Sequence, residues 1–412
     1  MRKSSKTLLG ACLALSSITS SFAQETQIKF FGQPEFNSQT TTTKGEFLPT
    51  TAWNNAQTSK TTKSAFSQGN YVLFITSQLN DKISILNENT VKLIGNQPIF
   101  EVQRLMAKIY FKDYLSFSVG KMFNPIGIWN NQYNMGLVLQ PTIQRPSIIR
   151  ASNEDGVLQI NNTGVQIEGN NITSLGLFYK LFVCNGNGVT NLSMNNKNQY
   201  ALTAAIGAKP IDGLTVVLST HQDQFNANEA NLAGVTNNDG GKSQLYNVSA
   251  AYMNPESKIE GIVEYYTQYS KFDNLPETNS YGLLGYVGYK VTNKLIPYIQ
   301  ASNLQAGTTA NTDIYYAGQT INGGISSDGI VYKINELTLG ARYKFTSNFV
   351  LKVEYNIKST NIEFQDEKFY LLSKNSDFSN GGPAINAPGY TSGNKTNNTF
   401  SHGPRVQLAF AF

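Results

Sequence analysis

Apolar and polar side chains alternate residue by residue over long stretches of this sequence. From Leu337 to Phe345 every second residue is apolar, and the residues between them are Thr338, Gly340, Arg342 and Lys344. After a short turn at 346–348 the alternation resumes, with Phe349, Leu351, Val353 and Tyr355 on one face. A period of two is that of a β-strand with one face in an apolar medium. The alternation therefore predicts strands whose two faces need different surroundings.

The last eight residues repeat this pattern and show which surroundings are needed. In 405–412 one face reads Val, Leu, Phe, Phe and the other reads Arg, Gln, Ala, Ala. A soluble β-sandwich would also alternate, but here each strand places charged residues on its second face, and these need water. A polar interior with an apolar exterior is the arrangement of a membrane β-barrel.

The composition agrees with this interpretation. Charged residues make up 14% of the 412 residues, against roughly 25% in soluble domains. After the first two dozen residues, no apolar run approaches the ~18–20 residues that a membrane-spanning helix requires. The 22 tyrosines and 23 phenylalanines recur along the whole chain, which argues against disorder.

Residues 1–23 are predicted to be a secretory signal peptide. Arg2, Lys3 and Lys6 form a basic start, an apolar stretch follows at 8–18, and 21–23 reads Ser-Phe-Ala, a small-x-small cleavage site. A retained membrane anchor is the weaker interpretation because the apolar stretch is too short to span. The mature chain, 24–412, would be a single barrel domain.

Cleavage would change the charge and the cysteine count. It would lower the net charge of +5 by three, leaving an excess too small to indicate nucleic-acid binding. Cleavage would also remove Cys12 and leave only Cys184. One thiol forms neither an internal disulfide nor a cysteine-based zinc site.

Sixteen strands are predicted, with boundaries uncertain by ~2–4 residues. They fall at 27–37, 70–79, 82–91, 99–111, 114–122, 157–168, 172–183, 198–208, 213–223, 244–253, 258–270, 280–291, 294–304, 334–345, 348–358 and 401–412.

The connections between these strands alternate in length. Seven short turns, rich in Gly, Pro, Asn and Asp, fall at 80–81, 112–113, 169–171, 209–212, 254–257, 292–293 and 346–348. Eight other connections, most of them long, fall at 38–69, 92–98, 123–156, 184–197, 224–243, 271–279, 305–333 and 359–400. Short periplasmic turns, long outer loops and an even strand number are the layout of a bacterial outer-membrane barrel.

A barrel of ~16 strands encloses an aqueous lumen rather than a packed core. Transport then needs no catalyst and no cofactor, only a constriction whose size and charge decide what passes. The sequence therefore predicts an outer-membrane porin of a Gram-negative bacterium, a passive diffusion channel for small hydrophilic solutes or ions. Its partners would be outer-membrane lipid and those solutes, with no nucleic acid.

Charged residues on the polar face of the strands are candidates for the channel wall. The last three strands would form a mildly basic strip that faces acidic residues elsewhere on the wall. A solvated face without selectivity is the alternative, since ion pairs in water are weak. The candidates are Arg104, Lys108, Glu260, Glu264, Arg342, Lys344, Lys352, Glu354 and Arg405.

Three stretches of the sequence resemble a known family. Residues 117–129 read FSVGKMFNPIGIW, residues 163–169 read TGVQIEG, and the hairpin 340–355 contains Gly-Ala-Arg-Tyr and Lys-Val-Glu-Tyr. They resemble the phosphate-selective porin O/P superfamily and related Bacteroidetes-type porins, and the final Phe412 resembles the assembly signal of outer-membrane barrels. The resemblance implies a sixteen-stranded diffusion channel, compatible with a homotrimer. The chain lacks the lysine-rich constriction of the phosphate-binding members, so phosphate selectivity is not predicted.

The third long connection, 123–156, is the candidate constriction loop. In general porins the loop at this place folds inward, and the resemblance carries that role over. An outer loop packed on its neighbours is the alternative. The charges that this segment would bring are Arg145, Arg150, Glu154 and Asp155.

Two other functions compete with the channel. An enzyme would need a nucleophile beside a base, but the two histidines, His221 and His402, lie in no recognisable catalytic or metal-ligand spacing. An adhesin, a receptor or a substrate-specific binding protein built on the same barrel would differ only in its loops. The sequence predicts no enzyme and no metal site.

Overall fold

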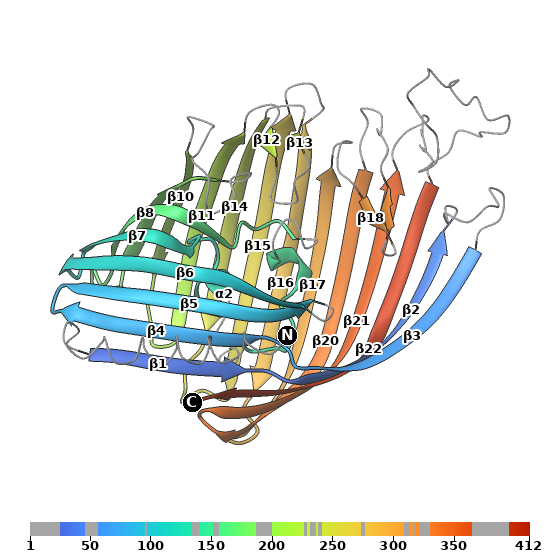
Figure 1. Ribbon diagram of the computed structural model, residues 1–412, viewed down its shortest axis with the longest axis horizontal. Coiled ribbons are helices and arrows are strands. Elements are labelled where there is room, and N and C mark those ends of the chain that lie inside the picture. The colour runs from blue at the N-terminus through green and yellow to red at the C-terminus, as the bar shows by residue number, and fades with distance from the viewer. Residues whose placement is uncertain are drawn as a thin grey trace, which may run out of the picture.

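The structure, a computed structural model, shows a closed β-barrel (Figure 1). It describes residues 25–45, 57–94, 97–133, 140–150, 156–186, 200–225, 229–230, 236–237, 241–272, 277–308, 314–316, 319–321, 330–364 and 395–412. The predicted signal peptide, 1–23, lies outside these residues. Within them no helix is both long and apolar enough to cross a membrane.

The main sheet contains 18 strands. The strands of its first half are β1 (Glu25–Gly32), β2 (Glu35–Gly45), β3 (Gln57–Ser67), β4 (Tyr71–Asn80), β5 (Ile83–Ile94), β6 (Gln97–Lys112), β7 (Leu115–Phe123), β8 (Asn161–Gly169), β9 (Phe178–Cys184) and β10 (Ala201–Ala208). Those of its second half are β11 (Leu214–Phe225), β14 (Gly241–Tyr252), β15 (Ile259–Phe272), β16 (Thr278–Tyr289), β17 (Leu295–Thr308), β20 (Ile330–Thr346), β21 (Phe349–Phe364) and β22 (Lys395–Ala411). Two short hairpins lie between these strands, β12 (Glu229–Ala230) with β13 (Thr236–Asn237) and β18 (Ile314–Tyr316) with β19 (Gln319–Ile321).

The wall is an antiparallel meander of sixteen strands, because β1 continues into β2 and β3 into β4. From β4 onward each wall strand pairs with the next along the chain. The last strand, β22, returns to the first, with Phe31 opposite Ala411 and Glu35 opposite Gln407. The prediction of a sixteen-stranded up-and-down barrel is confirmed.

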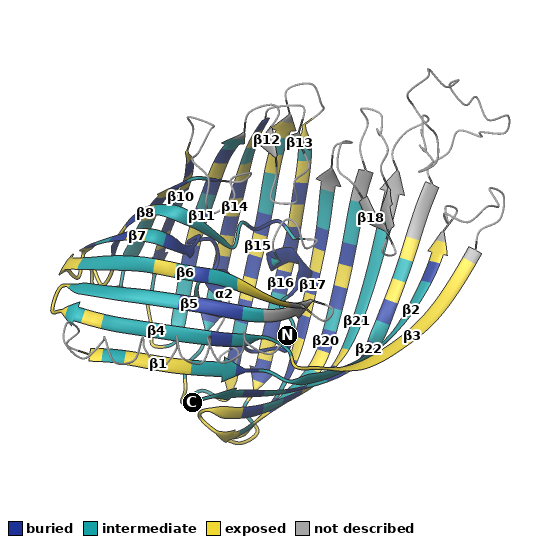
Figure 2. Cartoon of the chain, viewed as in Figure 1, coloured by how far each residue is buried: buried dark blue, intermediate teal, exposed yellow. Residues whose placement is uncertain are grey.

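Burial alternates along the strands as the sequence pattern requires (Figure 2). In β15, Glu260 and Glu264 are buried, whereas Val263 and Tyr265 are exposed. The same holds in β21, where Lys352 and Glu354 are buried and Val353 is exposed. Polar side chains thus point into the barrel and apolar ones point out. A soluble barrel has the opposite arrangement, so this one is built for a lipid exterior.

The prediction of a long loop at 38–69 is wrong. The structure has strand in most of it, because β2 and β3 pair from Glu35 with Ser67 to Gly45 with Gln57. Both strands are rich in threonine and serine and polar on both faces, so they lack the alternation on which the prediction relied. Threonine nevertheless has a high strand propensity, and that signal was available in the sequence.

A second difference concerns the turn predicted at 169–171. The structure extends this turn to residue 177, so β9 begins at Phe178 instead of 172. The Ile172 N–H donates to the Leu177 carbonyl at 3.0 Å, and Gly176 has a φ of 61°. Glycine tolerates that left-handed conformation at no steric cost. The local turn therefore replaces strand pairing here.

Closure of the barrel can be tested by cross-linking its first and last strands. Thr41 and Ser401 are register partners whose hydroxyl oxygens lie 3.1 Å apart. In a Cys184→Ser background, Thr41→Cys with Ser401→Cys is expected to form a disulfide under mild oxidation. Thr41→Cys with Ser67→Cys is the control, because Ser67 pairs with Glu35, six residues (about 20 Å) along the strand from Thr41. Equal disulfide yields in the two variants, measured by mass spectrometry, would contradict the register.

Candidate functional site: the lumen and its internal loop

After β7 the chain turns into the barrel instead of returning along its rim (Figure 1). The Asn124 N–H donates to the Ile160 carbonyl at 3.0 Å and the Asn124 amide side chain to the Gln159 carbonyl at 2.7 Å. These bonds hold together the two ends of the internal loop, which we define as residues 124–160. Gly127 has a φ of 68°, and a Cβ at this position would overlap the Tyr266 hydroxyl. A glycine is therefore required where the loop meets the inner wall.

The internal loop packs an apolar face against the wall. Its helix α2 (Ile128–Gln132) contributes Ile128 and Trp129, and its 3-10 helix η2 (Ser147–Ile149) contributes Ile148 and Ile149, all at most 1% exposed. They form one buried cluster with inward-facing side chains of the wall, among them Leu245, Ile262, Leu284, Leu304 and Ile334. Burying each such side chain stabilises the contact by about 1.5–3 kcal/mol.

Glu264 on β15 binds the start of α2. Its Oε1 accepts the backbone N–H groups of Ile128 and Trp129, each at 2.7 Å. The Tyr266 hydroxyl donates to the other carboxylate oxygen. Glu264 is fully buried, so without these donors its charge would be costly in this position. The carboxylate and the helix start thus require each other.

Glu354 and Lys352 on β21 hold the middle of the internal loop. The Ile143 N–H donates to Glu354 Oε1 at 2.6 Å, and the Tyr298 hydroxyl donates to the same oxygen at 2.6 Å. Lys352, which is 0% exposed, donates from Nζ to the Thr142 carbonyl at 3.3 Å. Adjacent residues of the loop are therefore fixed by two neighbouring inward positions of one strand.

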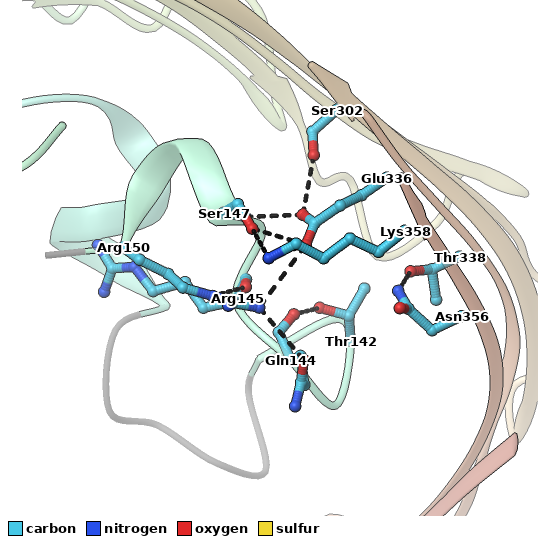
Figure 3. A network of polar contacts seen from close by, with 10 residues as sticks. All are labelled: Thr142, Gln144, Arg145, Ser147, Arg150, Ser302, Glu336, Thr338, Asn356 and Lys358. Carbon is cyan, nitrogen blue, oxygen red and sulfur yellow. Dashed lines mark hydrogen bonds and ion pairs between the residues drawn. The ribbon is translucent and has the colours of Figure 1, made fainter. Parts of the chain in front are cut away.

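Glu336 on β20 holds η2 (Figure 3). Its carboxylate accepts the Ser147 N–H at 2.8 Å, the Ser147 hydroxyl at 2.6 Å and the Ser302 hydroxyl at 3.2 Å. Arg150 Nη2 and Lys358 Nζ each lie 3.8 Å from Glu336 Oε1. Two cations and three hydrogen bonds thus surround a single buried carboxylate.

The two predicted loop arginines brace the internal loop. Arg145 donates from Nε to the Ile149 carbonyl and from Nη2 to Asn130 Oδ1 at 2.6 Å. Arg150 donates from Nε to the Arg145 carbonyl at 3.0 Å. Arg145 therefore ties α2 to η2, whereas Arg150 joins η2 to Glu336 on the wall.

Two more of the predicted wall residues, Arg104 and Lys108, lie on β6. Arg104 forms an ion pair with Glu88 on β5, and its guanidinium carbon lies 4.4 Å from the centre of the Phe123 ring. Lys108 binds Glu168 on β8, which also lies 3.9 Å from Lys180 on β9. These groups form a separate, mainly basic cluster on the wall from β5 to β9.

The predicted opposition of basic and acidic walls is wrong for its central pair. Arg342 on β20 contacts Glu260 on β15, and the Tyr286 hydroxyl donates to Glu260 at 2.6 Å. The two strands are separated only by β16 and β17, so their long side chains meet along one side of the lumen. Lys344 follows on the same face as Arg342 and is half-buried, and Arg405 donates to Asn37 Oδ1 at 3.2 Å.

Glu336, Lys358 and Ser147 were not among the site residues predicted from the sequence. Glu336 lies an even number of residues from Arg342, so both side chains are on the polar face of β20. Glu336 could therefore have been predicted as a wall residue. The apolar residues on inward positions were a second signal, because Ile262 and Leu284 interrupt the polar face where the internal loop packs. The predicted loop charges Glu154 and Asp155 lie outside the described residues. Within the described residues, no three His, Cys, Asp or Glu side chains are grouped as metal ligands.

Comparison with known proteins places this geometry in a known fold. No family model and no curated relative matches the chain. Among solved structures, it is similar to outer-membrane expressed OmpT of Vibrio cholerae, with 12% identity and a TM-score of 0.52 over 94% of this chain and 98% of that one. An anion-selective porin from Comamonas acidovorans has 11% identity and a TM-score of 0.52 over 94% and 100% of the two chains.

The chain has the porin fold. An in-vitro folded trimer form of Vibrio cholerae OmpT also matches, with 13% identity and a TM-score of 0.51 over 94% of this chain and 100% of that one. At such low identities the likeness concerns the backbone alone. The porin-type barrel described here therefore has to be interpreted from its own side chains.

The wall carboxylates are expected to fix the position of the internal loop. Glu264→Gln combined with Glu354→Gln removes two charged acceptors of loop N–H groups, each hydrogen bond contributing about 1.5–3 kcal/mol. We expect a larger and noisier single-channel conductance in planar bilayers, because the loop would leave the wall part of the time. Glu168→Gln is the matched control, since Glu168 is also a wall carboxylate in an ion pair but does not bind the loop. A double variant with the conductance of the control would contradict this role.

Proposed function

We propose that this protein is a porin of the bacterial outer membrane, which conducts small hydrophilic solutes passively. The observation that carries the proposal is a closed barrel with a polar inner face, an apolar outer face and a loop bound inside. We infer that the internal loop narrows the lumen at one level. Such a constriction decides what passes through a channel. Residues 123–156 are therefore proposed as the constriction.

The internal loop leaves one side of the lumen for the solute. The hydrogen bonds that fix it run to Ser219 on β11, Glu264 on β15, Glu336 on β20 and Glu354 on β21. The opposite part of the wall, from β5 to β9, carries the basic cluster around Lys108. We place the solute path between the loop and this cluster.

The accessible charge of the lumen favours anions. In six ion pairs among the described residues, the cation is more exposed than the carboxylate. The side chain of Arg104 is 22% exposed against 1% for Glu88, and that of Lys108 is 33% exposed against 9% for Glu168. Around Glu336 the exposures are 22% for Arg150 and 18% for Lys358 against 4%. A solute therefore meets ammonium and guanidinium groups, while the carboxylates lie behind them in the wall.

Three further points of the sequence analysis remain predictions. The signal peptide and the resemblance to the phosphate-selective porin O/P superfamily rest on sequence patterns. The homotrimer rests on that resemblance. The trimer form of the similar Vibrio cholerae barrel supports the last of these. An adhesin or receptor on the same barrel is the alternative function.

The histidines offer little support for an enzyme. His221 Nδ1 lies 2.8 Å from the Thr203 hydroxyl, but Thr203 is 0% exposed and cannot reach a substrate. His402 faces outward, with its Nδ1 2.7 Å from the Tyr355 hydroxyl. We therefore propose no catalytic activity for these groups.

Planar-bilayer recording of the refolded protein tests the channel directly. We expect discrete, ohmic conductance steps, because a water-filled lumen conducts without a carrier cycle. A correctly folded barrel, verified by circular dichroism and heat-modifiable mobility, that stayed electrically silent would favour the adhesin or receptor.

The anion preference is tested by neutralising the two lysines that share Glu168. Lys108→Gln with Lys180→Gln leaves this carboxylate unpaired in the lumen, so the reversal potential in a potassium chloride gradient should move toward cation preference. Lys82→Gln with Lys112→Gln is the control, because these lysines lie at the short-turn ends of the strands. If both variants kept the reversal potential of the native protein, the basic cluster would lie outside the solute path.

A further inference from the structure

Strand β3 has one unpaired edge. It pairs with β2 over its whole length, from Ser67 opposite Glu35 to Gln57 opposite Gly45. No other strand of the described chain pairs with its second edge. Side chains 58–67 are all exposed, including Phe66 at 88%. An edge strand of 11 residues thus offers its backbone N–H and C=O groups to the surroundings.

The geometry of the neighbouring strands produces this free edge. Strand β4 pairs with β5 only as far as Tyr71 opposite Val91, and β5 ends three residues later at Ile94. Between β3 and β4 the chain bends at Gly69, which has a φ of 65° and lies so close to the Gln33 carbonyl that a Cβ would overlap it. The β2–β3 hairpin therefore rises beside β22, away from the β5–β6 hairpin (Figure 1).

The hairpin carries positive charge along this edge. Lys60 and Lys63 lie on β3 and Lys44 lies on β2, all three exposed. Residues 37–45 and 57–67 contain no acidic side chain. Lysines on an edge strand oppose pairing with another positively charged strand and attract an acidic one.

We propose that the free edge of β3 is a docking site for an extended, acidic polypeptide segment of a partner protein. The segment would add a strand next to β3, with backbone hydrogen bonds providing affinity and the lysines providing selectivity. Because β3 follows the connection 46–56, this site lies at the end of the barrel that carries the long loops, on the outer side in the orientation proposed above.

Two other occupants fit the observations less well. Copies of one barrel share their orientation in a membrane, so two β3 strands would run in the same direction with lysines facing lysines. Antiparallel self-pairing is therefore excluded by the membrane orientation of the proposed porin. An anionic lipid headgroup would satisfy the lysines but would leave the alternating N–H and C=O groups of the edge unpaired.

The test uses the purified protein in nanodiscs and a fluorescent peptide of the length of β3. The peptide is built of threonine and valine with two glutamates three residues apart, so that one lies on each face as Lys60 and Lys63 do, and a second peptide carries lysines in their place. We expect the acidic peptide to bind and to slow hydrogen exchange of those backbone amides in 57–67 that point away from β2. Lys60→Glu with Lys63→Glu should weaken binding about tenfold at low salt, whereas Lys82→Glu with Lys209→Glu should leave it unchanged.

Several results would overturn the proposal. Binding of both peptides alike, or binding without protection of 57–67, would mean that no strand is added at this edge. Protection, in the protein alone, of the amides of 57–67 that point away from β2 would mean that a second copy or another segment of the chain already covers the edge. Protection only in nanodiscs of anionic lipid, without peptide, would assign the lysines to headgroups. Each result is independent of channel activity, so failure here leaves the proposed porin function untouched.

Discussion

Closure of the sheet is the constraint on which the rest of the structure depends. Lipid offers no hydrogen-bond partners, so a sheet edge inside a membrane would leave its backbone groups unsatisfied at a cost of several kcal/mol each. The first strand prevents this by pairing with β22, and the Phe30 N–H also donates to the carbonyl of Phe412 at 2.8 Å. Once the sheet is closed, every residue has a fixed inner or outer side. The alternation of polar and apolar residues follows directly from that geometry.

The interior shows how such a barrel can hold a loop without losing its channel. Glu264, Glu336 and Glu354 bind backbone N–H groups of the loop, so their charges are used for positioning. Buried carboxylates need such donors, and the loop needs acceptors for N–H groups that no strand satisfies. Arg150 and Lys358 beside Glu336 retain partial exposure, whereas Lys352 on the strand of Glu354 is fully buried. One set of wall charges thus fixes the loop, and another set, with Arg104 and Lys108, is partly exposed on the wall.

Much of the fold could be predicted from the sequence, because strand alternation and turn residues are local signals. The prediction failed at β2 and β3, which are rich in Thr and Ser on both faces and so show no alternation of polar and apolar residues. It also failed at the extended turn before β9. The site was harder to predict. Glu264 and Lys352 were recognisable as inward charges by parity, but their partners on the internal loop are more than a hundred residues distant in the chain. The odd or even position of a residue in a strand identifies the side of the wall on which it lies. Only the folded internal loop shows which wall charges contact it.

The internal loop is attached to one side of the wall. Substitutions on the two sides of the lumen are therefore expected to have different effects. Substitutions on β15, β20 or β21 act on solutes indirectly, because they move the loop and so alter the width of the passage. Substitutions of Lys108 or Lys180 leave the hydrogen bonds between the loop and these three strands in place, and under the proposed function they alter the charge that a solute meets. Under the proposed channel function, pore width and ion preference are therefore set by different side chains of the wall.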